Sequence, residues 1–397
     1  MKEKELNIDV DMRGYEFEDT RERIQAGKYM VEVAGAVLHD RKPDEPPPGL
    51  NIEDVYVAAK RHGLDCIVYD GIRKTKAADN RELMEKWTQR SRTYAMQGII
   101  QQSENRKICE TLSKEGVRVL PMKGSIMKKM YPKQEYRHMT DADILIDRKN
   151  MEKTRRIMEE LGYQFAGSES GDTVERYIKD PWMTVEMHTY MLPFRYKNHA
   201  RYLDVWKRCT EENGIGQMNW DDFYIFMIEH FAKHFDQSGC GVRFVLDIYV
   251  FLKEKGKEQN RAYIMQELRQ MGLEQFCITM EKIACDWFDE KPQIGDSKYE
   301  TIILLAGAFG ITEWVYASRQ KEFLDKYKIP CLAKAAYIFD RSFMDYHDMK
   351  VQYPILRKLP FLLPCTWVLR FFRIMLKSRT TMKKELQALG KNLKKIK

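Results

Sequence analysis

The chain has 397 residues, 44% hydrophobic and 12% aromatic, so it can bury a large core and form two or three folding units. Its net charge of +8 is concentrated in residues 355–397, where twelve Lys or Arg accompany one Glu, and the other 354 residues carry about −3 by subtraction. A body this close to neutral lacks the broad positive face of a dedicated nucleic-acid-binding protein. The eight cysteines are scattered without metal-binding spacing, which argues against structural zinc and predicts reduced thiols.

Residues 1–49 are predicted to form an N-terminal extension that ends in a loop, marked by the proline-rich DEPPPG. The first residues, MKEKELNIDVDMRGYEFEDTRER, are charged and contain no apolar segment or small-residue cleavage site. We therefore expect neither a secretory signal nor an N-terminal anchor, and we expect a cytoplasmic protein.

Three regions of regular structure follow along the chain. Residues 50–116 have apolar residues at helical spacing, as in IEDVYVAAKRHG, which predicts an N-terminal helical region. Residues 117–210 alternate predicted strands and helices: VRVLPMKG, DADILID, NMEKTRRIMEELG, VERYIK and MTVEMHTY. Helical periodicity returns in residues 211–354, from DDFYIFMIEHFAKHF onward. The predicted fold class is α+β, a small mixed sheet flanked by N-terminal helices and a large all-helical C-terminal region.

A Gly-Ser turn and a pair of aspartates stand close together in the central region. Gly124 and Ser125 follow the first predicted strand, where backbone N–H groups and a helix N-terminus can hold a phosphate. Asp141 and Asp143 alternate along the next predicted strand and so share one of its faces. Two carboxylates on one face can bind Mg²⁺.

Glu186, in the predicted strand TVEMHTY, is the candidate third carboxylate. Its expected roles are to bind a second Mg²⁺, in a site where two ions lie about 3.5–4 Å apart, and to act as the base for an attacking hydroxyl. His188 lies two positions further on the same face, where it orients Glu186 or satisfies a polar interior.

The strings LPMKGSIMKKMYP and YRHMTDADILID, the Gly-Tyr after the next helix and the later VEMH together resemble the uncharacterised nucleotidyltransferase family of the polymerase-beta-like superfamily. The resemblance extends over roughly residues 50–260, since DVYVAAKRHGL, HFAKHF and RFVLDI are similar to the flanking helical segments of that family. It implies that residues 117–210 form the nucleotidyltransferase core. Many members have Asp at the third acidic position, where this chain has Glu.

Carried over residue by residue, the resemblance implies a phosphate-binding turn, metal ligands and two phosphate-contacting cations. The turn is Gly124 and Ser125, the ligands are Asp141, Asp143 and Glu186, and the cations are Lys123 and Arg137. The activity implied is Mg²⁺-dependent transfer of a nucleoside monophosphate from a nucleoside triphosphate, such as ATP, to a hydroxyl acceptor on a small molecule or a protein, with release of pyrophosphate. The alternatives are a non-catalytic accessory protein that binds a nucleotide or a partner at a membrane surface, and a transferase acting on tRNA ends, which the near-neutral body matches poorly.

Two residue pairs of the helical half carry open interpretations. His230 and His234 lie one turn apart on a helical face, a spacing that suits zinc. No third ligand is evident in the sequence, so we expect a pair of packed histidines that faces the cleft and supports the site. Arg243 and Asp247 are also one turn apart and predict an intrahelical ion pair, with a role in substrate binding as the alternative.

The basic tail, residues 355–397, combines apolar, aromatic and cationic residues. Pro360 and Pro364 break its apolar run, and Arg370 and Arg373 interrupt it, which argues against a spanning helix. The pattern is typical of an amphipathic segment lying on the inner face of an anionic membrane or on an acidic partner. The alternative is that residues 359–376 pack on the helical half while the last residues are solvated.

Overall fold

The structure is a computed structural model. It describes residues 20–169, 173–192, 196–308, 310–311, 353–357 and 359–377, together with Leu332, Ala336, Phe339, Phe343, Tyr346 and Met349. Residues 1–19 of the predicted N-terminal extension and residues 378–397 of the basic tail lie outside this set, so the structure says nothing about them. The predicted α+β class is confirmed, because helices surround a seven-stranded sheet that contains both parallel and antiparallel pairs.

The chain divides into two compact units, one of Met1–Gln164 with Tyr177–Gly310 and one of Phe165–Arg176 with Ile311–Lys397. The first unit holds most of the regular elements. Its N-terminal helices are α1 (Thr20–Leu38), α2 (Ile52–His62), α3 (Asp65–Ile72) and α4 (Arg81–Lys114). Its later helices are α5 (Gly124–Met127), α6 (Met151–Glu160), α7 (Trp220–Ser238), α8 (Val242–Lys255), α9 (Arg261–Met271), α10 (Glu274–Phe288) and α11 (Lys298–Ala306).

Helix α1 is a core element, although its sequence lies in the segment predicted as an extension. Met30, Val31, Val33 and Ala34 are fully buried, and α1 packs on α2, α3, α10 and α11. A helix covered on nearly every side has no polar stripe, so its apolar residues show no amphipathic period. The sequence pattern for this reason predicts no helix here.

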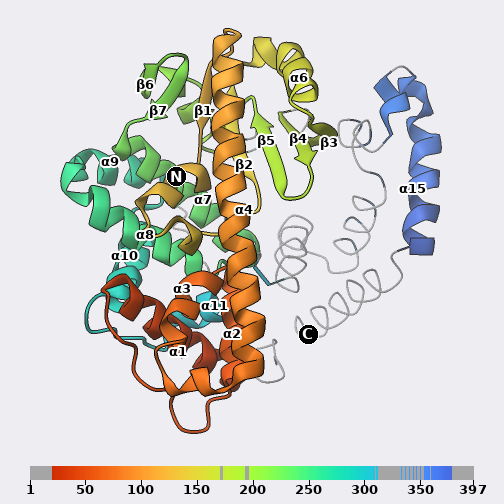
Figure 1. Cartoon of the computed structure of the whole chain (residues 1–397). Coiled ribbons are helices and arrows are strands. Elements are labelled where there is room, and N and C mark those ends of the chain that lie inside the picture. Colours follow the sequence, from red (N-terminus) through yellow and green to blue (C-terminus); the bar gives the residue numbers. More distant parts are fainter. Residues whose placement is uncertain are drawn as a thin grey trace. The chain divides into compact units, whose positions relative to one another are not determined.

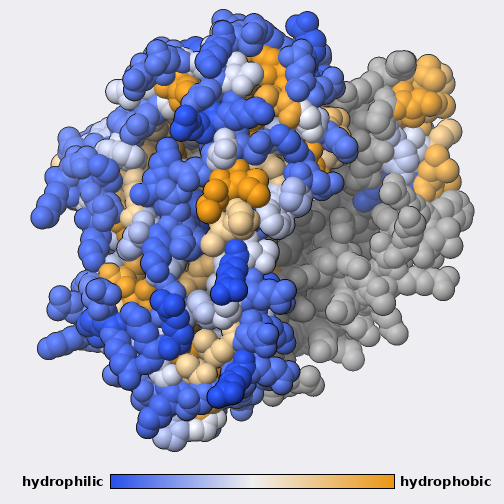
Figure 2. Space-filling model, viewed as in Figure 1, coloured by the Kyte–Doolittle hydropathy of each residue, from blue (hydrophilic) through white to orange (hydrophobic). Residues whose placement is uncertain are grey.

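Helix α4 has 34 residues and reaches from the N-terminal helices to the sheet (Figure 1). Its N-cap is Asn80, whose side chain accepts a hydrogen bond from the backbone N–H of Leu83. Near its C-terminal end it packs on strands β1 (Val119–Pro121) and β5 (Met183–His188). Hydrophilic residues cover most of the face of the molecule shown in Figure 2, with small separate apolar areas.

The sheet has the strand order β3-β4-β5-β2-β1-β7-β6. The strands not yet given are β2 (Ala142–Ile146), β3 (Gln164–Glu169), β4 (Val174–Lys179), β6 (Cys209–Glu212) and β7 (Ile215–Met218). Strand β2 is antiparallel to β1 and parallel to β5. All five residues of β2 are buried, so both faces of this central strand are covered. Strands β6 and β7 form an antiparallel hairpin in a segment where no strand is predicted, because both strands are short and partly polar.

The second unit contains α15 (Leu363–Lys377), preceded by short 3₁₀ turns at Pro354–Arg357 and Pro360–Leu362. Phe343 packs edge-on against Trp367 of α15, with ring centroids 5.4 Å apart. Phe361, Val368 and Leu369 are largely exposed. Among the helices of the described residues, none combines the length and the apolar character needed to cross a bilayer.

Candidate functional site

Parallel pairing of β2 with β5 brings an aspartate, a glutamate and a histidine together. Asp143 is the register partner of Glu186, and Leu145 is the partner of His188. Because side chains two positions apart share a face of a strand, Glu186 and His188 lie on the same face as Asp143. Donor atoms of Asp143, Glu186 and His188 all lie within 4.8 Å of one another. We call these three residues the carboxylate–histidine cluster.

The cluster is held by short polar contacts to the buried carboxylate of Asp143. His188 Nε2 lies 2.8 Å and Lys123 Nζ 2.5 Å from Asp143 Oδ1, and His188 Nε2 lies 3.7 Å from Glu186 Oε2. Burial by itself raises the pKa of Asp143, but the charge of Lys123 and the hydrogen bond from His188 outweigh it and hold this pKa well below its usual range. Burial lowers the pKa of His188, so its imidazole is neutral and its Nε2–H donates to the Asp143 carboxylate.

The Lys-Gly-Ser turn adjoins this cluster. Lys123 has a positive φ of 48° with ψ −119°, a backbone conformation that is costly for a residue with a side chain. Gly124 is tightly enclosed, since a Cβ there would lie 3.0 Å from Met139 Sδ and 3.3 Å from Arg137 Nη1. Ser125 is 8% exposed, and its hydroxyl oxygen has no hydrogen-bond partner in the described part of the chain. An orphaned buried hydroxyl beside ionised groups fits a site completed by a polar ligand.

The helix that follows the turn is short. Helix α5 is a single turn, and the chain continues as a 3₁₀ turn at Lys128–Met130. A dipole built from so few peptide units contributes little to anion binding. Any phosphate affinity of this turn must therefore come from its backbone N–H groups, from the Ser125 hydroxyl and from nearby cations.

Asp141 does not join the carboxylate–histidine cluster. Strand β2 begins at Ala142, so Asp141 precedes it, and its carboxylate accepts a hydrogen bond of 3.1 Å from Thr140 Oγ1. Burial lowers the pKa of Lys123, and the charge of Asp143 outweighs burial and raises it. The charge of Asp141 raises this pKa further, so Asp141 acts on the same site.

Arg137 forms an ion pair with Asp247, a residue of the helical half. Its guanidinium contacts both carboxylate oxygens of Asp247 on α8, with Nη2–Oδ2 at 2.8 Å, and its Nη1 donates to the carbonyl oxygen of His138 at 2.9 Å. Tyr131 donates a further hydrogen bond of 2.7 Å to Asp247. In the described part of the chain Arg243 forms no ion pair with Asp247, in contrast to the predicted intrahelical pair. A bidentate contact from Arg137 is the stronger interaction and takes the carboxylate.

His230 and His234 on α7 contact each other through their Nε2 atoms at 3.0 Å. Burial, followed by the charges of Lys233 and Lys123, lowers the pKa of His234 to about 4, and burial lowers that of His230 still more clearly. Both rings are neutral at pH 7, and one donates a hydrogen bond to the other. Within the described residues the three-ligand group is the carboxylate–histidine cluster, which does not include this pair.

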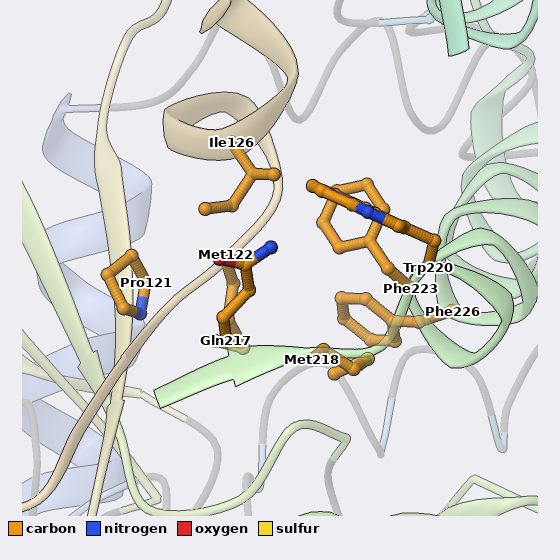
Figure 3. Close-up of a pocket in the computed structure, with 8 residues that line it drawn as sticks. All are labelled: Pro121, Met122, Ile126, Gln217, Met218, Trp220, Phe223 and Phe226. Carbon is orange, nitrogen blue, oxygen red and sulfur yellow. The ribbon is translucent and has the colours of Figure 1, made fainter. Parts of the chain in front are cut away.

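A small apolar pocket is lined in part by Met122 and Ile126, which flank the Lys-Gly-Ser turn in the sequence (Figure 3). Its lining comes from β1, α5, β7 and α7: Pro121, Met122, Ile126, Gln217, Met218, Trp220, Phe223 and Phe226. Its volume of about 10 Å³ suffices for about one water molecule. This pocket is thus a packing defect of the core and is too small for a nucleotide.

The donor set of the cluster fits a divalent metal ion. Carboxylate oxygens are the preferred ligands of Mg²⁺, and the low pKa of Asp143 keeps that carboxylate ionised. The apolar alternation around Glu186 predicts its orientation correctly. The hydrogen bond from His188 to Asp143, instead of to Glu186, follows from strand pairing and leaves no mark in the local sequence pattern.

Residues 48–289 match the model of a protein family described as uncharacterised nucleotidyltransferase. The matched segment is more than half of the chain and contains the Lys-Gly-Ser turn, the cluster, α7 and α8. Comparisons with curated proteins and with solved structures found no match.

Proposed function

Because the chain belongs to the uncharacterised nucleotidyltransferase family, we propose that it transfers a nucleoside monophosphate from a nucleoside triphosphate to a hydroxyl acceptor in a Mg²⁺-dependent reaction that releases pyrophosphate. The observation that supports this proposal most is the convergence of Asp143, Glu186 and His188 beside the Lys-Gly-Ser turn. Two bound Mg²⁺ ions would neutralise the charge of the triphosphate and make the acceptor hydroxyl easier to deprotonate.

Each residue of the site has a proposed task. Asp143 and Glu186 bind the cations through carboxylate oxygens, with Asp141 as a further ligand. His188 holds the Asp143 carboxylate in place through its Nε2–H. Lys123, Gly124 and Ser125 bind and orient the phosphates, and the buried Ser125 hydroxyl donates a hydrogen bond that it otherwise lacks.

The proposed reaction is an in-line displacement at the α-phosphorus. The acceptor oxygen forms the new P–O bond, the bond to the bridging oxygen of pyrophosphate breaks, and the acceptor proton moves to a carboxylate oxygen of Glu186. Catalysis comes from positioning and from charge neutralisation. The near-neutral body of the chain favours an acceptor on a small molecule or a protein over a nucleic acid.

A non-catalytic role in nucleotide or partner binding is the alternative. Asp143, 6% exposed, and Glu186 place two carboxylates beside the single ammonium of Lys123, and a site without a further cation to bind has no physical need of this arrangement. The cluster is thus more consistent with catalysis.

For the basic tail we propose contact with an anionic surface at the inner face of a membrane. The exposed apolar side chains of Phe361, Val368 and Leu369 favour it, since they lie in a segment with a charge balance of +11.

The test is incubation of the purified chain with each α-labelled nucleoside triphosphate, Mg²⁺ and a cell extract, followed by identification of the labelled product. We expect label in one class of acceptor, and none with Asp143→Asn. Asp147→Asn is the matched control, because Asp147 directly follows the same strand but lies outside the cluster. Equal labelling by the Asp143→Asn variant and the unmodified chain would show that the proposed mechanism is wrong.

A further inference from the structure

Three cationic side chains lie together beside the Lys-Gly-Ser turn. Arg137 and Arg243 both donate from Nη1 to the carbonyl oxygen of His138, at 2.9 and 3.3 Å. Lys128, in the 3₁₀ turn after α5, is 5% exposed. Burial lowers the pKa of His138 most, and the positive charges of Arg243, Arg137 and Lys128 lower it further. We call Lys128, Arg137 and Arg243 the cation group.

The cation group has fewer acidic partners than charges. Asp247 is its one ion-paired acid in the described chain, and this carboxylate is taken by Arg137 and Tyr131. In the same described residues Arg243 and Lys128 form no ion pair, and the buried Nε of Arg243 has no hydrogen-bond partner. Asp247 and, less strongly, Asp141 act on Arg243 through their charges without an ion pair, and the charge of Asp141 acts on Arg137 as well.

Lys128 is buried and Arg243 is half-buried, and cations so enclosed without an ion-paired carboxylate are unfavourable in a folded protein that binds nothing there. Burial, followed by the charge of Arg137, lowers the pKa of Arg243 to about 10, which still leaves it protonated at neutral pH. Burial and Arg137 likewise lower the pKa of Lys128. The missing negative charge is therefore expected from a ligand.

The position of the group indicates which anion it accepts. Arg137 Nη1 lies 3.3 Å from the point where a Cβ of Gly124 would be, so the group is continuous with the turn that carries the orphaned Ser125 hydroxyl. Guanidinium N–H groups match phosphate oxygens in geometry and charge. We propose that Arg243 and Lys128 bind the β- and γ-phosphates of the nucleoside triphosphate, an assignment of the ligand that rests on the proposed function. Arg243 is then a specificity residue, which distinguishes triphosphates from monophosphates.

The experiment measures binding of inorganic tripolyphosphate to the full chain by titration calorimetry, without acceptor and without transfer. We expect Arg243→Met and Lys128→Met each to weaken binding of tripolyphosphate and of nucleoside triphosphate by about 10- to 100-fold, the loss expected for one charge-assisted hydrogen bond, and to leave nucleoside monophosphate binding unchanged. Arg106→Met, which removes an exposed arginine of α4, is the control and should change neither affinity.

A second readout separates ligand binding from a structural role. Removing an enclosed cation that lacks an ion-paired counter-ion should leave the urea midpoint of unfolding unchanged or raise it. A lowered midpoint in both variants, or an unchanged affinity for tripolyphosphate in both, would overturn the proposal.

Gly98→Ala gives an independent perturbation if Arg243→Met fails to fold. A Cβ at Gly98 would lie 2.6 Å from Lys128 Nζ and would displace this flexible ammonium. We expect weaker tripolyphosphate binding from this variant too, and an unchanged affinity would count against the role of Lys128. A chain that binds tripolyphosphate as expected but labels no acceptor would contradict the proposed function and leave the anion subsite intact.

Discussion

Replacement of Asp247 by Asn tests the electrostatics around the site most sharply. Asp247 is 4% exposed and accepts contacts at 2.9, 3.2 and 2.8 Å from Arg137, and one at 2.7 Å from Tyr131. Asn preserves the shape and one acceptor oxygen but removes the negative charge. Arg137 would then remain buried beside Arg243 and Lys128 without its counter-ion. We expect the free energy of unfolding to fall by about 3–5 kcal/mol, as for other broken buried ion pairs.

The assay is urea unfolding of the full chain followed by tryptophan fluorescence, with the midpoint and slope compared to those of the unmodified protein. Glu110→Gln is the matched control, because Glu110 pairs with Arg106 on the exposed face of α4, and its loss should cost only about 0.2–0.5 kcal/mol. A loss below about 1 kcal/mol for Asp247→Asn would refute the reasoning. In the double variant Arg137→Met, Asp247→Leu, part of the stability should return, because Arg137 is no longer a buried charge without its partner.

Three further predictions concern catalysis, pH and packing. Glu186→Gln should lower the Mg²⁺-dependent transfer rate by about 10²-fold or more at saturating nucleotide, and retention of the full rate would remove Glu186 from the proposed mechanism. Burial lowers the pKa of His62 to about 4, so His62 is protonated at a lower pH in the folded chain than in the unfolded chain. The free energy of unfolding should therefore fall by about 3 kcal/mol as the pH drops from about 6.5 to 4. The His62→Gln variant should show a flatter pH profile of the unfolding midpoint. Gly71→Ala would place a Cβ 2.4 Å from Val33 Cγ1 and should lower the free energy of unfolding, measured with urea, by about 1–3 kcal/mol. Gly256→Ala is the control and should leave it unchanged, because Gly256 has φ −58° and its added Cβ would meet no atom closer than 3.8 Å.

The parts of the site that lie within single strands are predictable from the sequence. Alternation in β5 correctly places Glu186 and His188 on one face, and the apolar run ADILI correctly places Asp143 in a buried strand. Asp141 directly precedes this strand, and its role as a further metal ligand stays a prediction. Local periodicity carries no information on where a strand begins to that accuracy.

The parts that depend on distant pairing are not predictable in this way. Arg137 and Asp247 are 110 residues apart, and the local spacing of Arg243 and Asp247 predicts a competing ion pair instead. The choice between the two depends on the geometry with which two guanidinium groups approach one carboxylate. Helix α1 and the β6–β7 hairpin are missed for related reasons, since complete burial and short, partly polar strands both remove the alternation that marks an element.

The unbroken length of α4 limits how the first unit can move. A helix of 34 residues measures about 51 Å, and its hydrogen-bond ladder resists bending. Helix α4 packs on α3 toward one end and on β1 and β5 toward the other. It therefore fixes the distance between the N-terminal helices and the strands that carry Asp143 and Glu186. Opening or closing of the site around a substrate must consequently come from segments that do not pack along α4. A proline placed near the middle of α4 would break the helix and allow its two halves to move independently.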